Sequence, residues 1–246
     1  LLVVLFFIWL GARIGSIGIG FAGGFGVFVL GLVFGLKPGA IPTDVILIIM
    51  GVIAAIAAMQ EAGGLEYLVH LAEKVLKSNP KYITFLAPVV TYVMTMFAGT
   101  GHTAFSTLPV IAEVAKREGI RPSRPLAIAT VASQIAITAS PISAAVVFFS
   151  AELEKSGIDY VQLLMIAIPS SFIAVMLGAV VSNFMGKDLK DDPIYQERLA
   201  KGLVQLNPKE SEEKIIPPEA KRSVLIFGIA IICVVFYATA ISDTVG

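Results

Sequence analysis

The feature that most constrains this chain is a series of long apolar segments with little or no charge. They fall at about residues 1–10, 17–36, 44–60, 82–99, 103–115, 125–150, 160–185 and 223–241. Several are long enough to span about 30 Å of hydrocarbon as a helix. Only 15% of the residues are charged, against about 25% in soluble domains. The sequence therefore predicts an all-α polytopic membrane protein in which residues 1–246 form a single membrane domain.

The basic residues fall almost entirely on one side of this predicted membrane. The count assumes that 82–99 and 103–115 enter and leave on the same side, and that every other long segment crosses. Lys37 and Lys155 are then the only two of the 18 lysines and arginines on the far side. Cytoplasmic loops are rich in Lys and Arg, so the chain starts outside and 186–222 is a cytoplasmic polar loop. The net charge of zero argues against nucleic acid as a partner.

A first polar interruption lies in the stretch MFAGTGHTAF, where Thr100, Gly101, His102 and Thr103 follow an apolar run. The return leg is short and contains Pro109, and two full crossings would need a tight outer turn with almost no polar loop. A re-entrant hairpin with its tip near the midplane fits better. Charge counting does not separate the two arrangements, because both return to the same side.

A second interruption lies in SQIAITASPISAAV, within the segment 125–150. Pro141 lacks a backbone donor and clashes with the preceding helical turn. The residue before a proline, here Ser140, is pushed toward an extended conformation. We therefore expect the helix to break here and a new helix to begin around Pro141.

Two broken helices at membrane depth indicate a binding site, because such backbone survives only when it is buried in protein or lines a wet cavity. Free N–H groups at the start of a half-helix attract anions, and neither 82–115 nor 125–150 contains Lys or Arg. The site would therefore hold an anion with backbone dipoles and hydroxyls, without a cofactor or a metal. The candidate substrate-binding residues are Thr100, Gly101, His102, Thr103, Gln134, Thr138, Ser140, Pro141 and Ser143.

Some of these residues also have purely structural interpretations. A proline kink whose hydroxyls bond their own helix is common in membrane proteins. His102 is a candidate to bind substrate, to carry a proton, or to hydrogen-bond the hairpin tip. Gln134 is a candidate for a helix-to-helix hydrogen bond or for lining the cavity. The single cysteine, Cys233, excludes a disulfide within the chain.

Three further segments have recognisable patterns. Apolar residues at 3- and 4-residue spacing in 65–77 predict an amphipathic helix, either in the cytoplasmic interface or as an ordinary loop helix. Asp192 before Pro193 predicts a helix start, with Asn207-Pro208 as its end. The glycines of GARIGSIGIGFAGG lack the spacing of nucleotide-binding loops, and as small residues four apart they predict close helix packing.

The chain closely resembles the DcuA/DcuB family of bacterial anaerobic C4-dicarboxylate transporters. The resemblance rests on GARIGSIGIGFAGG, AGGLEYLVHLAEKVLKSNPKYIT, FAGTGHTAFSTLPVIAEVAK, QIAITASPISAAVV and DDPIYQERL, which occur in this order. It implies a multi-pass carrier of the bacterial cell inner membrane that exchanges fumarate, succinate, malate or aspartate, commonly fumarate inward for succinate outward in anaerobic respiration. It also covers about the N-terminal half of a family member, so we expect a C-terminal half with a second interrupted pair.

The chain is also similar to the wider ion-transporter superfamily, whose inverted repeats each contain a re-entrant hairpin and a broken helix. That likeness implies a hairpin tip at 99–103 and a break at 138–143. The Ser-Asn-Thr tip of that superfamily is absent, because Gly101-His102-Thr103 stands in its place, so the motif implies no sodium site here.

Two alternatives to dicarboxylate exchange stay open at this point. One is cation-coupled symport of a di- or tricarboxylate, and the other is a sensing subunit that binds the ligand without moving it. An intramembrane enzyme is not expected, because the sequence lacks HExxH, GxSxG and paired intramembrane aspartates. The expected partners are small dicarboxylate anions and the lipid bilayer, and the sequence leaves open whether copies assemble as a homo-oligomer.

Overall fold

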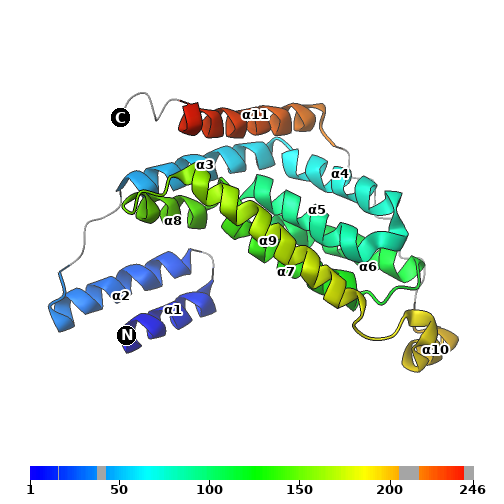
Figure 1. The fold of residues 1–246 in the computed structure, drawn as a ribbon. Coiled ribbons are helices and arrows are strands. Elements are labelled where there is room, and N and C mark those ends of the chain that lie inside the picture. The colour runs from blue at the N-terminus through cyan, green and yellow to red at the C-terminus, as the bar shows by residue number, and fades with distance from the viewer. Residues whose placement is uncertain (16, 38–42, 205–215, 241–246) are drawn as a thin grey trace. The chain divides into compact units, whose positions relative to one another are not determined.

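The computed structural model describes residues 1–15, 17–37, 43–204 and 216–240, apart from a few side chains within helices. Every regular element in these ranges is helical, and they contain no strand. The chain divides into two compact units, Leu1–Asp44 and Val45–Gly246. Figure 1 shows the order of the helices within each unit. The all-α architecture predicted from the sequence is confirmed.

The first unit contains α1 (Leu2–Ile14) and α2 (Gly18–Phe34), which pack against each other. A Cβ atom added to Gly11 would lie 3.1 Å from the Cα of Ile19, and one added to Gly26 would lie 3.0 Å from the ring of Phe7. The two backbones therefore approach closely at Gly11, whereas Gly26 leaves room for the ring of Phe7. Gly11 confirms the predicted packing role of the glycines, whereas Gly20 and Gly24 face open space.

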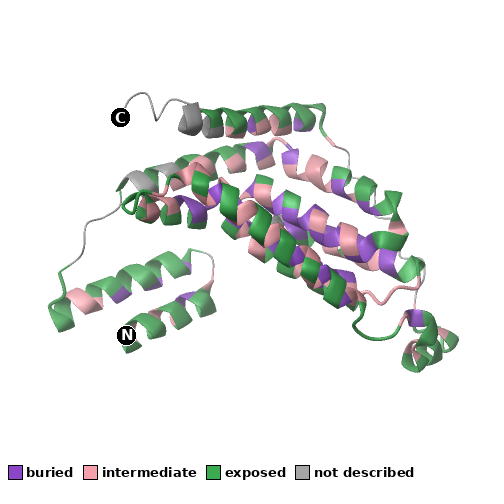
Figure 2. Cartoon of the chain, viewed as in Figure 1, coloured by how far each residue is buried: buried purple, intermediate pink, exposed green. Residues whose placement is uncertain are grey.

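The second unit contains the remaining helices, apart from the first two residues of α3. In chain order they are α3 (Thr43–Glu61), α4 (Gly64–Ser78), η1 (Pro80–Tyr82), α5 (Ile83–Ala98), η2 (Gly101–Thr107), α6 (Leu108–Arg117), α7 (Ser123–Ala136), η3 (Ile137–Ala139), α8 (Ala144–Glu154), α9 (Tyr160–Asn183), η4 (Leu189–Asp191), α10 (Pro193–Ala200) and α11 (Pro218–Ala240). Figure 2 shows that buried residues concentrate along α5 and α7, whereas α11 is mostly exposed or half-buried.

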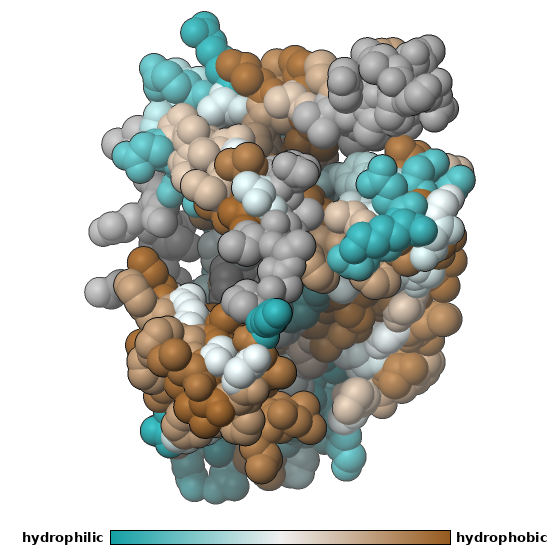
Figure 3. All heavy atoms as spheres, turned by 90° about the vertical axis from the view of Figure 1, so that its left-hand side faces the viewer, coloured by the Kyte–Doolittle hydropathy of each residue, from teal (hydrophilic) through white to brown (hydrophobic). Residues whose placement is uncertain are grey.

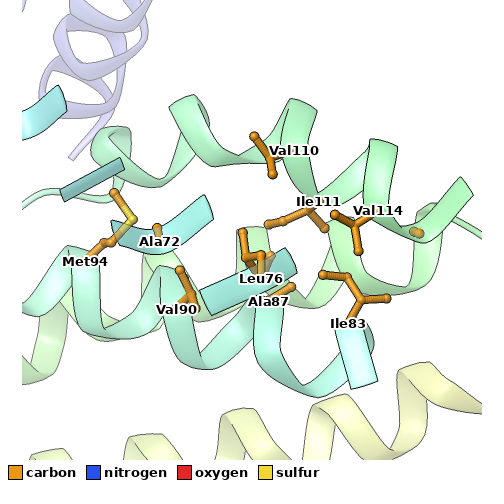
Figure 4. Close-up of a cluster of buried hydrophobic side chains, with 11 residues drawn as sticks. Ala72, Leu76, Ile83, Ala87, Val90, Met94, Val110, Ile111 and Val114 are labelled. Carbon is orange, nitrogen blue, oxygen red and sulfur yellow. The ribbon is translucent and has the colours of Figure 1, made fainter. Parts of the chain in front are cut away.

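The core of the second unit lies where α4, α5 and α6 meet (Figure 4). Leu76 of α4, Ile83 of α5 and Ile111 of α6 are fully buried in this cluster. Burying one such side chain contributes about 1.5–3 kcal/mol. The amphipathic helix predicted at 65–77 is thus present as α4, and its apolar side packs on the protein.

Within the described residues, three stretches are long and apolar enough to cross a membrane: Pro80–Ala98, Ser123–Glu154 and Tyr160–Asn183. A fourth is the pair Ile49–Glu61 and Gly64–Ser78, bent by 71°, if it counts as one span. Many large apolar side chains are exposed on these helices. On the face drawn in Figure 3 hydrophobic side chains form broad patches, as expected for a surface that contacts lipid.

The segment after α9 is tied to the start of α7 by arginines. Arg124 bonds the backbone carbonyls of Met185 and Gly186, each at 2.7 Å, and the carboxylate of Asp188 at 2.6 Å. Arg121 contacts the carboxylate of Asp192 at 3.2 Å. These contacts fix the connection between α6 and α7 against the segment that leads into α10.

The predicted start of the loop helix is confirmed, and its predicted end is wrong. Asp192 caps α10 by accepting hydrogen bonds from the amides of Ile194 and Tyr195. The helix ends at Ala200, before the predicted end at 207. Gly202 has φ +66°, and a left-handed residue at this point terminates a helix. Residues 205–215 lie outside the described part of the chain.

Candidate functional site

The hairpin tip begins where α5 ends. Gly99 has φ +67°, ψ 2°, and its amide bonds the carbonyl of Thr95. The chain then continues as the 3-10 helix η2 and returns as α6, with Pro109 in its first turn, where a proline lacks no helical bond. Both legs contribute to the core around Ile83 and Ile111. The two legs therefore pack together as a helical hairpin whose turn is at 99–107.

The second interruption separates α7 and η3 from α8. Ser140 (φ −80°, ψ 123°) and Ser143 (φ −78°, ψ 142°) are both extended, on either side of Pro141 and Ile142. The predicted break is thus confirmed. The new helix begins at Ala144, three residues later than predicted, because Ser143 is its N-cap.

Ser143 forms hydrogen bonds with the chain on both sides of the break. Its hydroxyl accepts a hydrogen bond from the amide of Val146 at 3.2 Å and donates one to the carbonyl of Ile137 at 2.6 Å. An N-cap serine satisfies one of the free amides at a helix start. The amides of Ala144 and Ala145 donate no hydrogen bond to the described part of the chain. As far as the structure describes the chain, these two amides are free donors at the positive end of α8.

The two interruptions lie against each other. The hydroxyl of Ser140 donates a hydrogen bond to the carbonyl of Met96, in the last turn of α5, at 2.8 Å. A Cβ atom added to Gly99 would lie 3.1 Å from the carbonyl oxygen of Ile142. The hairpin tip also contacts α7, since a Cβ atom on Gly101 would lie 2.4 Å from the side-chain nitrogen of Gln134. The tip and the break thus form one connected structure.

A cavity of about 300 Å³ opens beside this contact. It is lined by Ile49, Ile53, Ile56, Ala57, Gln60, Ala98, Gly99, Thr100, Ile142 and Ala144. One wall is α3, and the other consists of the hairpin tip and the start of α8. None of the lining residues is charged. The size lies at the lower end of the range for small-molecule sites, and Ala144 brings the start of α8 to its wall.

A second cavity of about 680 Å³ lies between α8 and α9. It is lined by Thr138, Ala145, Val146, Phe148, Phe149, Leu163, Ala167, Ser170 and Ser171. The hydroxyl of Tyr160, at the start of α9, donates a hydrogen bond to the carbonyl of Pro141. The hydroxyls of its polar lining residues, Thr138, Ser170 and Ser171, bond carbonyls three or four positions earlier in the chain, so this cavity offers an anion few side-chain donors.

The sequence-predicted site residues therefore divide into groups. Thr100 lines the smaller cavity, and the buried Gly101 packs beside Gln134. Ser140 and Ser143 are buried and donate to backbone carbonyls, so they hold the break in place. The half-buried Pro141 lies within the break.

The other predicted residues lie away from the smaller cavity, or their side chains are not described by the structure. Thr138 lines the larger cavity and bonds the carbonyl of Ile135. Gln134 is exposed, with its amide 3.4 Å from the hydroxyl of Ser133. The side chains of His102 and Thr103 lie outside the described part of the structure. The sequence predicted an apolar segment at 44–60, which is α3, but it assigned none of the α3 residues to the site, although those that line the cavity follow a helical spacing.

Comparison with known proteins assigns the chain to a family. The profile described as "Anaerobic c4-dicarboxylate membrane transporter", DcuA_DcuB, matches residues 1–245. The chain belongs to the DcuA/DcuB family. It is therefore a multi-pass membrane protein of the bacterial inner membrane. No solved structure matches the chain, so the likeness to the ion-transporter superfamily stays a prediction from sequence.

Several members of the DcuA/DcuB family are similar along the whole chain. The C4-dicarboxylate transporter DcuA of Wolinella succinogenes is 65% identical over 246 residues, which are all of this chain and 56% of that protein. DcuA of Escherichia coli K12 is 56% identical over 247 residues, again covering 56% of that protein. An Escherichia coli anaerobic C4-dicarboxylate transporter DcuB is 42% identical, over 80% of this chain and 45% of its own length. The chain thus spans about half the length of these relatives.

Proposed function

We propose that the protein is a secondary transporter of C4-dicarboxylates such as fumarate, succinate, malate and aspartate, and not an enzyme. Its relatives are named C4-dicarboxylate transporters. The observation that carries the proposal is the hydrogen bond from Ser140 to the carbonyl of Met96, which joins the two interrupted helices beside an uncharged cavity. Substrate would bind in that cavity.

Binding would rely on donors without formal charge. The amide of Ala144 lies at the N-terminal end of α8, where the helix dipole favours an anion. Thr100 adds a side chain from the hairpin tip, and Gly101, His102 and Thr103 follow it in the sequence. Discontinuous helices with their N-termini at an anionic group are a recurrent arrangement in secondary transporters. None of the described residues that line the cavity is a lysine or arginine, so a dianion is held without a fixed ion pair.

Transport would follow an alternating-access cycle. The hydrogen bond between Ser140 and Met96 and the close packing at Gly99 make the hairpin and the broken helix move together. Bound substrate satisfies the amide of Ala144 and lowers the barrier to reorientation, whereas the empty carrier reorients poorly. That difference produces exchange of one dicarboxylate for another, commonly fumarate for succinate.

The test is counterflow in proteoliposomes that contain the purified full-length protein. Vesicles preloaded with fumarate should take up labelled succinate much faster than empty vesicles, and preloading with a monocarboxylate should give no stimulation. The same assay with and without a sodium gradient separates exchange from cation-coupled symport. Binding of succinate without any flux would show a sensing subunit and overturn the proposal.

A further inference from the structure

The α3 wall of the smaller cavity is apolar except at one position. Ile49, Ile53, Ile56 and Ala57 line it, followed by Gln60 in the last turn of α3. The spacing from Ile49 follows i, i+4, i+7, i+8 and i+11, so these residues share one face of the helix. Gln60 is therefore the polar end of an otherwise apolar stripe that faces the cavity.

The chemistry of Gln60 suits a ligand group. Its side-chain amide offers two donors and one acceptor, and it forms no hydrogen bond with another described residue. It is half-buried and lies in a bent helix pair that has the composition of a membrane span. A polar side chain without a protein partner is unfavourable in such a place, and where it occurs it often marks a substrate pathway.

A dicarboxylate has two anionic ends, and the cavity has two polar regions. Ala144 and Thr100 lie on the wall formed by the break and the hairpin tip, and Gln60 lies on the α3 wall. The side chains between them, such as Ile53 and Ile56, are apolar and suit the carbon chain of a small acid. The first polar region alone would serve a monocarboxylate equally well.

We propose that Gln60 is a substrate-binding residue that donates a hydrogen bond from its amide to the second carboxylate and so selects dicarboxylates over monocarboxylates. This inference rests on the proposed function of the cavity. It assigns α3 a direct part in recognition, in addition to the two interrupted helices.

The experiment measures binding of fumarate and succinate to the full-length protein in detergent by calorimetry, and exchange in proteoliposomes. Gln60→Met keeps the length of the side chain and removes the donors, and we expect dicarboxylate affinity to fall about tenfold or more. Gln60→Glu places a carboxylate near the substrate and should weaken binding further. Gln162→Met makes the same change at an exposed position on α9, outside the lining residues of the cavity, and should leave affinity within about twofold of wild type.

Each outcome decides one question. Wild-type affinity in Gln60→Met, in a protein whose wild type binds and exchanges dicarboxylates, would overturn the role of Gln60 and leave the proposed function intact. Failure of the wild type to bind any dicarboxylate would overturn the proposed function itself. If Gln60→Met does not fold, Gln60→Asn keeps the amide on a shorter side chain. It should bind dicarboxylates more weakly than wild type, and unchanged affinity would reject the proposal.

Discussion

The hydroxyl of Ser140 donates a 2.8 Å hydrogen bond to the backbone carbonyl of Met96, and this bond joins a broken helix to the end of a hairpin leg 44 positions earlier in the chain. The carbonyl of Met96 lies in the last turn of α5, where a helix leaves its carbonyls without an internal partner. The hydrogen bond therefore joins the two irregular segments, and the sequence of either segment alone does not determine that it forms.

Ser140→Ala removes this link. We expect a loss of about 1–2 kcal/mol in the free energy of unfolding, because a buried bond is lost, and a fall of at least tenfold in counterflow. Ser150→Ala is the control, since the Ser150 hydroxyl bonds the carbonyl of Val147 in its own helix at 2.9 Å. Thermal unfolding in detergent and succinate counterflow are the measurements. Equal exchange by both variants would show that the link is not needed for transport.

Gly99→Ala tests the close approach at the hairpin tip. A left-handed conformation costs a non-glycine residue about 1–2 kcal/mol, and the added methyl group would also crowd the carbonyl of Ile142 at 3.1 Å. Gly119→Ala is the matched control, because Gly119 has φ +72° but no atom within 4 Å of an added Cβ. Gly99→Ala should unfold at a lower temperature than Gly119→Ala and should lose exchange. Identical unfolding temperatures would mean that the hairpin tip accommodates the added methyl group without additional strain.

Local sequence was sufficient to predict both interruptions. Pro141 and the glycines around Thr100 act on their own backbone, and the structure interrupts the chain at the expected positions. The start of α8 was misplaced by three residues because the cap is Ser143 and not the residue before Pro141. A capping serine is a local signal that could have corrected the prediction.

The tertiary part of the candidate site was not predictable in the same way. Ser140 was expected to face substrate, yet its hydroxyl donates to Met96, and the pattern of one helix does not show which carbonyl a neighbouring helix presents. The contribution of Gln60 depends on α3 lying beside the tip, which only packing determines. The sequence was sufficient to predict residues that interrupt their own helix. It was not sufficient to predict contacts that a residue makes with a neighbouring helix.

Two threonines on α5, one turn apart, should respond differently to the same substitution. Thr91 donates to the carbonyl of Ala129 on α7 at 2.9 Å, whereas the fully buried hydroxyl of Thr95 has no hydrogen-bond partner among the residues that the structure describes. Valine has nearly the same shape and removes the hydroxyl. Thr91→Val should lose about 1–2 kcal/mol of unfolding free energy, and Thr95→Val should be neutral or slightly more stable.

Thermal unfolding in detergent measures this difference. A loss of stability in Thr95→Val as large as in Thr91→Val would show that the Thr95 hydroxyl has a partner in the folded protein. Reduced exchange in Thr95→Val with unchanged stability would show that the hydroxyl is used in another state of the transport cycle.

Arg124 should contribute far more to stability than an exposed ion pair of similar length. Its side chain is only 10% exposed and bonds Asp188 as well as two carbonyls at the end of α9. Arg124→Ala leaves those acceptors without their charged donor, and we expect a loss of about 2–4 kcal/mol. Arg124→Lys keeps the charge but not the planar fork of donors, so an intermediate loss is expected.

Lys155→Ala is the control for Arg124. Lys155 pairs with Glu152 at 2.8 Å, but the two side chains are 69% and 51% exposed, so its removal should cost less than about 1 kcal/mol. The measurement is the free energy of unfolding of the wild type, Arg124→Ala, Arg124→Lys and Lys155→Ala at low and high salt. Screening acts mainly on exposed pairs, so the effect of Arg124→Ala should persist at high salt. If the loss of unfolding free energy in Arg124→Ala disappears at high salt, the contacts at the end of α9 stabilise the protein no more than an exposed ion pair does.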